Sequence, residues 1–178
     1  MVQPGLAVQQ AARYLAALAL AAAAVVSSLA AHGEELRNWF NDPFFQVRSD
    51  LKDRDCPVPR GPFMDEAQKL RETHNRAERG TTCWLTGHCS KPNAYLYDPE
   101  IAVGVKARFE SATGLEGSSL WVTVQRRIVW IEGCVPEAVT DQRLEALVRD
   151  VPDVEQVIVV VARPHAGKVP YLTLEPPR

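Results

Sequence analysis

The apolar residues between Ser119 and Val161 change their spacing twice, and this constrains the fold more than any other feature of the sequence. Two short runs, 120–124 and 128–135, are rich in β-branched and aromatic residues and flank the polar triplet Gln125-Arg126-Arg127. Such a pattern is typical of a two-stranded β-hairpin. Further along, Val154 to Val161 is a β-branched run of strand length, which predicts a third strand.

Two helices are predicted beside these strands. Between the second and third strands, apolar residues recur at intervals of three and four, which places them on one helix face: Leu144, Leu147, Val148 and Val151. Thr140 is a favourable N-cap for this helix, and Pro152-Asp153 ends it. Upstream, Asp98-Pro99 predicts an N-cap with proline in the first helical position, and Gly114 stops that helix. The predicted order is helix, strand, strand, helix, strand, an α+β sandwich of a short sheet and two helices.

The segment 129–135, followed by the amphipathic helix and then by 151–157, resembles the BON domain, a small module of bacterial envelope proteins. The resemblance covers residues 98 to about 162 and rests on Gly133 and the spacing of the valines, with Arg127 where the family usually has glycine. It implies a periplasmic or membrane-apposed module that binds phospholipid surfaces or other envelope proteins, often in osmotic or envelope stress. It implies neither enzyme activity nor a cofactor.

The first 31 residues differ in composition from the rest of the chain. Arg13 precedes an uncharged, alanine-rich run that ends in Ser28-Leu29-Ala30, a pattern of small residues typical of signal-peptide cleavage after Ala30 or Ala31. The alternative is an uncleaved anchor, because the uncharged run just reaches the length needed to span a bilayer. We therefore expect export to the periplasm, with an inner-membrane anchor as the alternative.

All four cysteines follow the predicted cleavage site: Cys56, Cys83, Cys89 and Cys134. In an oxidising compartment this even number predicts two disulfides. Three pairings are possible, and each joins Cys134 to a cysteine of the preceding segment. A metal site built from Cys83, His88 and Cys89, with Cys56 or His74, is a weaker alternative because the paired short spacings of ordinary zinc sites are missing.

The region before the predicted module, residues 32–97, is interpreted as a disulfide-tied extension that docks on it. It contains an extended aromatic start, a proline-rich turn, a polar helix from Met64 to Arg79 and a cysteine loop. The thin apolar stripe of that helix comprises Met64, Ala67, Leu70, His74 and Ala77. Residues 163–178 form a tail, and its proline content favours a mobile extension over an added edge strand.

Side chains alternate across a strand, so the predicted sheet has a second apolar face pointing away from the helices. This face comprises Trp121, Ile128, Trp130, Cys134, Ile158 and Val160. Because a solvated face would be polar, something must cover it. The cysteine-containing segment, tied through Cys134, is the favoured cover, and a lipid surface or a partner protein is the functional alternative.

Charge and motif content exclude several function classes. The formal net charge is -2 and no basic cluster occurs, which argues against nucleic-acid binding. The sequence contains no Gly-x-Ser-x-Gly motif or equivalent local signature of a hydrolase. It also has no glycine-rich phosphate-binding loop before a predicted helix. We therefore expect an exported, non-enzymatic binding protein, with an assembly subunit of an envelope complex as the alternative. A small metal- or thiol-dependent enzyme is a third possibility.

Overall fold

The computed structural model describes residues 35–52, 55–78, 81–164 and 168–174. Leu36 to Arg178 form one compact unit. The predicted signal peptide lies outside the described residues. Within the part of the chain that is described, no helix is both long enough and apolar enough to cross a bilayer.

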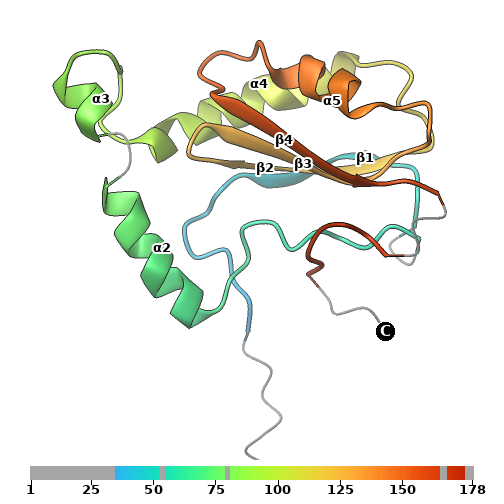
Figure 1. Ribbon diagram of the computed structural model, residues 1–178, viewed down its shortest axis with the longest axis horizontal. Coiled ribbons are helices and arrows are strands. Elements are labelled where there is room, and N and C mark those ends of the chain that lie inside the picture. The colour runs from blue at the N-terminus through green and yellow to red at the C-terminus, as the bar shows by residue number, and fades with distance from the viewer. Residues whose placement is uncertain (1–34, 53–54, 79–80, 165–167, 175–178) are drawn as a thin grey trace, which may run out of the picture. The chain divides into compact units, whose positions relative to one another are not determined.

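One four-stranded sheet forms the centre of this unit (Figure 1). The strands lie in the order β1 (Phe44–Ser49), β2 (Ser119–Gln125), β3 (Ile128–Cys134) and β4 (Gln156–Ala162). The first three are antiparallel to their neighbours, whereas β3 and β4 are parallel. The predicted hairpin and third strand are thus confirmed, and so is the α+β fold class. Strand β1, which was not predicted, comes from the extension and lies at the edge beside β2.

Two helices, α4 (Asp98–Ser111) and α5 (Asp141–Val148), cover one face of the sheet (Figure 1). Their apolar side chains meet those of alternate strand residues in the main core, which includes Ile101, Val105, Phe109, Val122, Val129, Ile131, Leu144 and Val148. Thr140 caps α5 as predicted, because its hydroxyl accepts a hydrogen bond of 3.2 Å from the amide of Arg143. Before α4 lie α2 (Glu66–Glu78), α3 (Thr81–Leu85) and a 3-10 turn over Ala94–Tyr97.

Asp98 has a different role from the one predicted. Tyr97 is the N-cap of α4, and the buried carboxylate of Asp98 instead accepts hydrogen bonds from the amides of Arg126 and Arg127, at 2.9 and 2.8 Å. Both arginines have positive φ, 57° and 65°, in the turn between β2 and β3. A side chain costs energy in this conformation, so the carboxylate stabilises a turn that is usually made with glycine.

Gly133 allows a close approach between β2 and β3. Its φ is 141°, and a Cβ atom at this position would lie 2.1 Å from the carbonyl oxygen of Ser119. No other residue fits there without moving the backbone of β2, so this position requires glycine.

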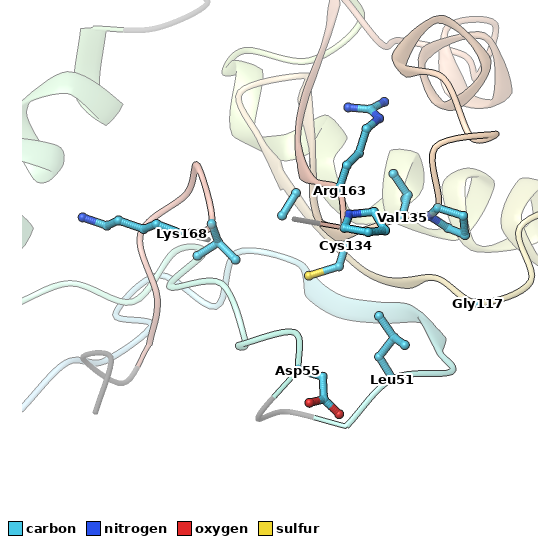
Figure 2. A pocket seen from close by; sticks show the side chains of 11 residues that line it. Leu51, Asp55, Gly117, Cys134, Val135, Arg163 and Lys168 are labelled. Carbon is cyan, nitrogen blue, oxygen red and sulfur yellow. The ribbon is translucent and has the colours of Figure 1, made fainter. Parts of the chain in front are cut away.

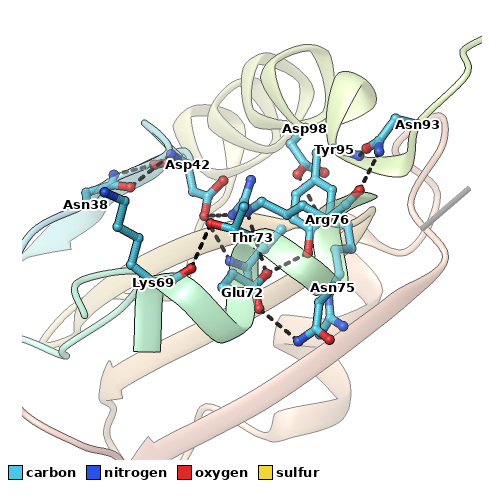
Figure 3. Close-up of polar contacts among 12 residues, drawn as sticks. Asn38, Asp42, Lys69, Glu72, Thr73, Asn75, Arg76, Asn93, Tyr95 and Asp98 are labelled. Atoms are coloured by element: carbon cyan, nitrogen blue, oxygen red, sulfur yellow. Dashed lines mark hydrogen bonds and ion pairs between the residues drawn. The ribbon is translucent and has the colours of Figure 1, made fainter. Parts of the chain in front are cut away.

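Polar contacts (Figure 3) and cation-π contacts attach helix α2 to the rest of the unit. Its predicted apolar stripe does not, since Leu70 is 68% exposed. The guanidinium of Arg76 lies 3.9 Å from the ring centres of both Phe40 and Tyr95. It also forms an ion pair with the buried carboxylate of Asp42. The stripe was too thin to bury, and the opposite side of the helix makes the contact.

Candidate functional site

Two disulfides join the four cysteines, as predicted, and they settle the pairing. Cys56 is bonded to Cys134 across 78 residues of sequence, and Cys83 is bonded to Cys89 across 6. All four sulfur atoms are therefore in disulfides, whereas a metal site or a thiol-dependent enzyme would need them as thiolates.

The Cys56–Cys134 disulfide fixes part of the extension against the outer face of the sheet, the face opposite α4 and α5. A second buried cluster forms there from Cys56, Trp121, Cys134 and Ala162, with Leu51, Val58 and Val169 packed around it. Trp121 is only 5% exposed. This end of the outer face is thus covered by the chain itself, through the segment around Cys56 and not through the Cys83–Cys89 loop.

The C-terminal tail completes this cover. Tyr171 is buried, and its hydroxyl donates a 2.9 Å hydrogen bond to the carbonyl of Pro57. Backbone hydrogen bonds run from Arg60 to Leu172, 2.7 Å, and from Leu174 to Val58, 2.9 Å. The prediction of a mobile tail is therefore wrong for residues 168–174, because Tyr171 and these backbone bonds anchor them beside the disulfide.

The other predicted face residues are only half-buried: Ile128, Trp130, Ile158 and Val160. Trp130 is directly beside Ile158 in the paired strands β3 and β4. We call these four residues the open row. The predicted binding face is thus divided into a covered end, which contains Trp121, and the open row.

Glu132 is a carboxyl group on the same apolar face, between Trp121 of β2 and Val160 of β4. Burial raises its pKa to about 7, and the charge of Arg60 opposes this shift only in part. Alternation along β3 placed Glu132 on the outer face, but only the cover explains why its carboxyl is shielded from water.

A cavity of about 370 Å³ opens at the covered end of the sheet (Figure 2). Its wall includes the apolar side chains of Leu51, Val135 and Val169 beside the disulfide, with Arg163 and Lys168 as the cationic members. Arg163 is bound within the chain, since it donates to the carboxylate of Asp141 at 2.6 Å.

Two large apolar side chains that are adjacent in sequence, Trp84 and Leu85, are exposed to solvent by 45% and 76%. Both belong to α3, and the Cys83–Cys89 disulfide closes the loop that carries them. We call residues 81–89 the Trp84 loop. The compact loop was predicted, but its exposed apolar tip was not. The short spacing of the two cysteines could have indicated it, because a loop closed so tightly cannot bury a tryptophan within itself.

A cavity of about 190 Å³ lies between the base of the Trp84 loop and the hairpin turn of the sheet. Both cysteines of the loop line it, and its charged lining residues are Lys91, Arg126, Arg127 and Glu155. Lys91 pairs with Glu100 and Arg127 with Glu155, at 2.7 and 2.6 Å. The Nε atom of Arg126 is buried and has no hydrogen-bond partner within the described part of the chain. This arrangement offers an apolar tip beside a guanidinium that can donate to an anion.

A family model described as the BON domain matches residues 97–162, which confirms the resemblance noted from the sequence. The match spans α4, the hairpin, α5 and β4, and thus the two helices that cover the sheet and three of its four strands. No curated protein and no solved structure matches the chain.

Proposed function

We propose that this protein is a non-enzymatic envelope protein and binds a phospholipid surface through the Trp84 loop. The premise is that residues 97–162 are an envelope-associated BON domain. The exposure of Trp84 and Leu85 is the observation that carries the proposal. Tryptophan is favoured at the interface between lipid and water, and burying the leucine side chain contributes roughly 1.5–3 kcal/mol. The disulfide supports this role because it holds the tip in place before contact, which lowers the entropy lost on binding.

Glu100 and Glu155 pair with Lys91 and Arg127, so Arg126 is the cation of this cavity that favours an anionic headgroup. A phosphate at the mouth of this cavity would meet the guanidinium group of Arg126, which lines it. One cation near an anionic leaflet contributes about 1 kcal/mol. The whole chain has a formal net charge of -2, so this attraction is local to the site.

The experiment is vesicle flotation of the oxidised mature chain, residues 32–178, with phosphatidylglycerol vesicles and with phosphatidylcholine vesicles. We expect binding that prefers the anionic vesicles. The double substitution Trp84→Ser and Leu85→Ser should weaken it by about tenfold or more, since each factor of ten corresponds to about 1.4 kcal/mol. Leu172→Ser is the matched control, because Leu172 is 63% exposed on the tail. Equal flotation of the double variant and the control would refute the Trp84 loop as the contact.

Export is part of the proposal, because the loop can meet an envelope lipid in oxidised form only outside the cytoplasm. Mass spectrometry of the protein recovered from the periplasm should give a chain that begins at Ala31 or His32, with no thiol open to alkylation. Alkylated thiols, or a chain that retains residues 1–30, would contradict periplasmic release. A role in osmotic or envelope stress is tested separately, by deleting the gene and comparing the growth of the deleted and parent strains after osmotic shock.

A second candidate is an assembly subunit of an envelope complex, and the open row favours it. Four apolar side chains remain half-buried on a sheet face whose other end the chain covers itself. Co-purification from cross-linked envelopes would distinguish the two functions. A partner that is lost with Trp130→Ala but kept with the Trp84 loop double variant would identify the open row as a protein contact.

A further inference from the structure

Strand β4 is an open edge of the sheet. It pairs with β3 over all seven residues without a register shift, and no other strand of the described chain lies on its far side. Its sequence from Gln156 to Ala162 contains no charge, no proline and no glycine. Each residue from Val157 to Val161 is half-buried, whereas β2 is buried from Ser119 to Val124.

The opposite edge strand, β1, has the features by which proteins prevent strands from pairing with another chain. Its register shifts between Gln46 and Arg48, and Arg48 places a charge within the strand. Irregular geometry and charged residues protect an edge, while a regular and uncharged edge strand is a template for another strand. Only β4 is left in this unprotected form among the strands described.

The sequence of β4 and its flanks is complementary to itself in one antiparallel register. Glu155 and Arg163 are the charged residues that bound the strand, and they lie equally far before and after Val159. A two-fold axis at Val159 therefore puts Glu155 of each chain opposite Arg163 of the other. In this register Ile158 faces Val160 of the other chain.

We propose that β4 pairs with β4 of a second copy of this chain, antiparallel about Val159, so that two four-stranded sheets join into one. The two flanking charges select the second copy, because any shift of register removes both cross-chain ion pairs. Side-chain alternation is preserved across the junction, so the valines of the helix face meet valines. On the outer face, the open rows of the two chains meet and form one apolar strip.

Each flanking charge already has a partner in its own chain: Glu155 pairs with Arg127, and Arg163 pairs with Asp141. The Glu155 side chain is nevertheless 57% exposed, which leaves room for a second cation. The backbone hydrogen bonds of β4 supply the affinity, and the charges fix the register.

The experiment is sedimentation of the oxidised mature chain without lipid, from micromolar to near-millimolar concentration. We expect the mass of two chains at the upper concentrations. Val160→Lys should reduce it to one chain, because each lysine would then lie against Ile158 of the other chain in the apolar strip. Val103→Lys is the matched control, since Val103 is 69% exposed on α4, and it should sediment as the native chain does.

Hydrogen exchange of the native chain provides a second readout that needs no variant. The amides of residues 156–162 should become more protected as the protein concentration rises, while those of β1 should not change. A single-chain mass at every concentration, or a dimer that Val160→Lys leaves intact, would overturn the proposal. Neither measurement involves vesicles, so failure here would not touch the lipid-binding function.

Discussion

Replacing Glu132 with glutamine should stabilise the protein at neutral and alkaline pH but not in acid. Glu132 lies on the apolar outer face, where burial raises its pKa from 4.5 to about 7. The folded state therefore holds the proton more tightly than the unfolded state does. The stability that the protonated carboxyl provides is fully present below pH 4.5 and is lost as the pH rises through about 7.

The magnitude follows from the two pKa values. A change from 4.5 to about 7 corresponds to about 3 kcal/mol once both states are ionised. Glu132 is half-buried, so water reduces this penalty, and we expect about 1–2 kcal/mol. Glutamine keeps the shape of the side chain without the charge and should recover this amount.

The assay is urea denaturation of the oxidised mature chain and its Glu132→Gln variant at about pH 4 and about pH 8. The variant should be more stable than the native chain at the higher pH, and the two should be nearly equal at the lower one. Glu110→Gln changes an exposed glutamate of α4 and serves as the matched control. The same stability difference at both pH values would refute the reasoning, because a pH-independent effect cannot arise from ionisation.

Three further substitutions test individual contacts. Asp98→Ala should lower the free energy of unfolding at about pH 8 by about 3 kcal/mol, since two turn amides lose an acceptor that is charged above its burial-raised pKa of about 6. In the same denaturation assay, Asp50→Ala, which removes the acceptor of one exposed amide, should cost less than about 1 kcal/mol; equal losses would contradict the role given to Asp98. Replacing Cys56 and Cys134 by serine should cost about 4 kcal/mol, because the disulfide closes a loop of 78 residues, and acrylamide should then quench tryptophan fluorescence more strongly. Unchanged quenching would mean that the cover stays in place without the disulfide. Gly133→Ala should leave no soluble folded protein, as judged by circular dichroism, because its Cβ would meet the backbone of β2.

The features that the sequence predicted well are those encoded by near neighbours. Alternating apolar residues predicted β2 and β3, and a three-to-four spacing after Thr140 predicted α5. Each of these patterns depends on residues within one or two turns or strand repeats. The family resemblance arose from the same local patterns, which is why it covered α4 to β4 and no more.

The features that were missed depend on contacts between distant residues. β1 has an irregular register and half-buried residues, so its sequence carries little of the alternation that marks a strand. Asp98 was predicted to be a helix cap because Pro99 follows it. The amides that it accepts from belong to a turn 28 and 29 residues away, which a local pattern does not reveal. The cysteine count predicted two disulfides, but only the fold could choose among three pairings.

The unit that folds is larger than the segment that the family model recognises. A fragment limited to residues 97–162 would lose β1, the segment around Cys56 and the tail. It would present the backbone of β2 as a second open edge, uncover Trp121 and leave Cys134 as a free thiol. Any attempt to transplant this module into another protein should therefore carry the residues from Leu36 onward, because part of its hydrophobic interior is supplied by chain that lies outside the recognised boundary.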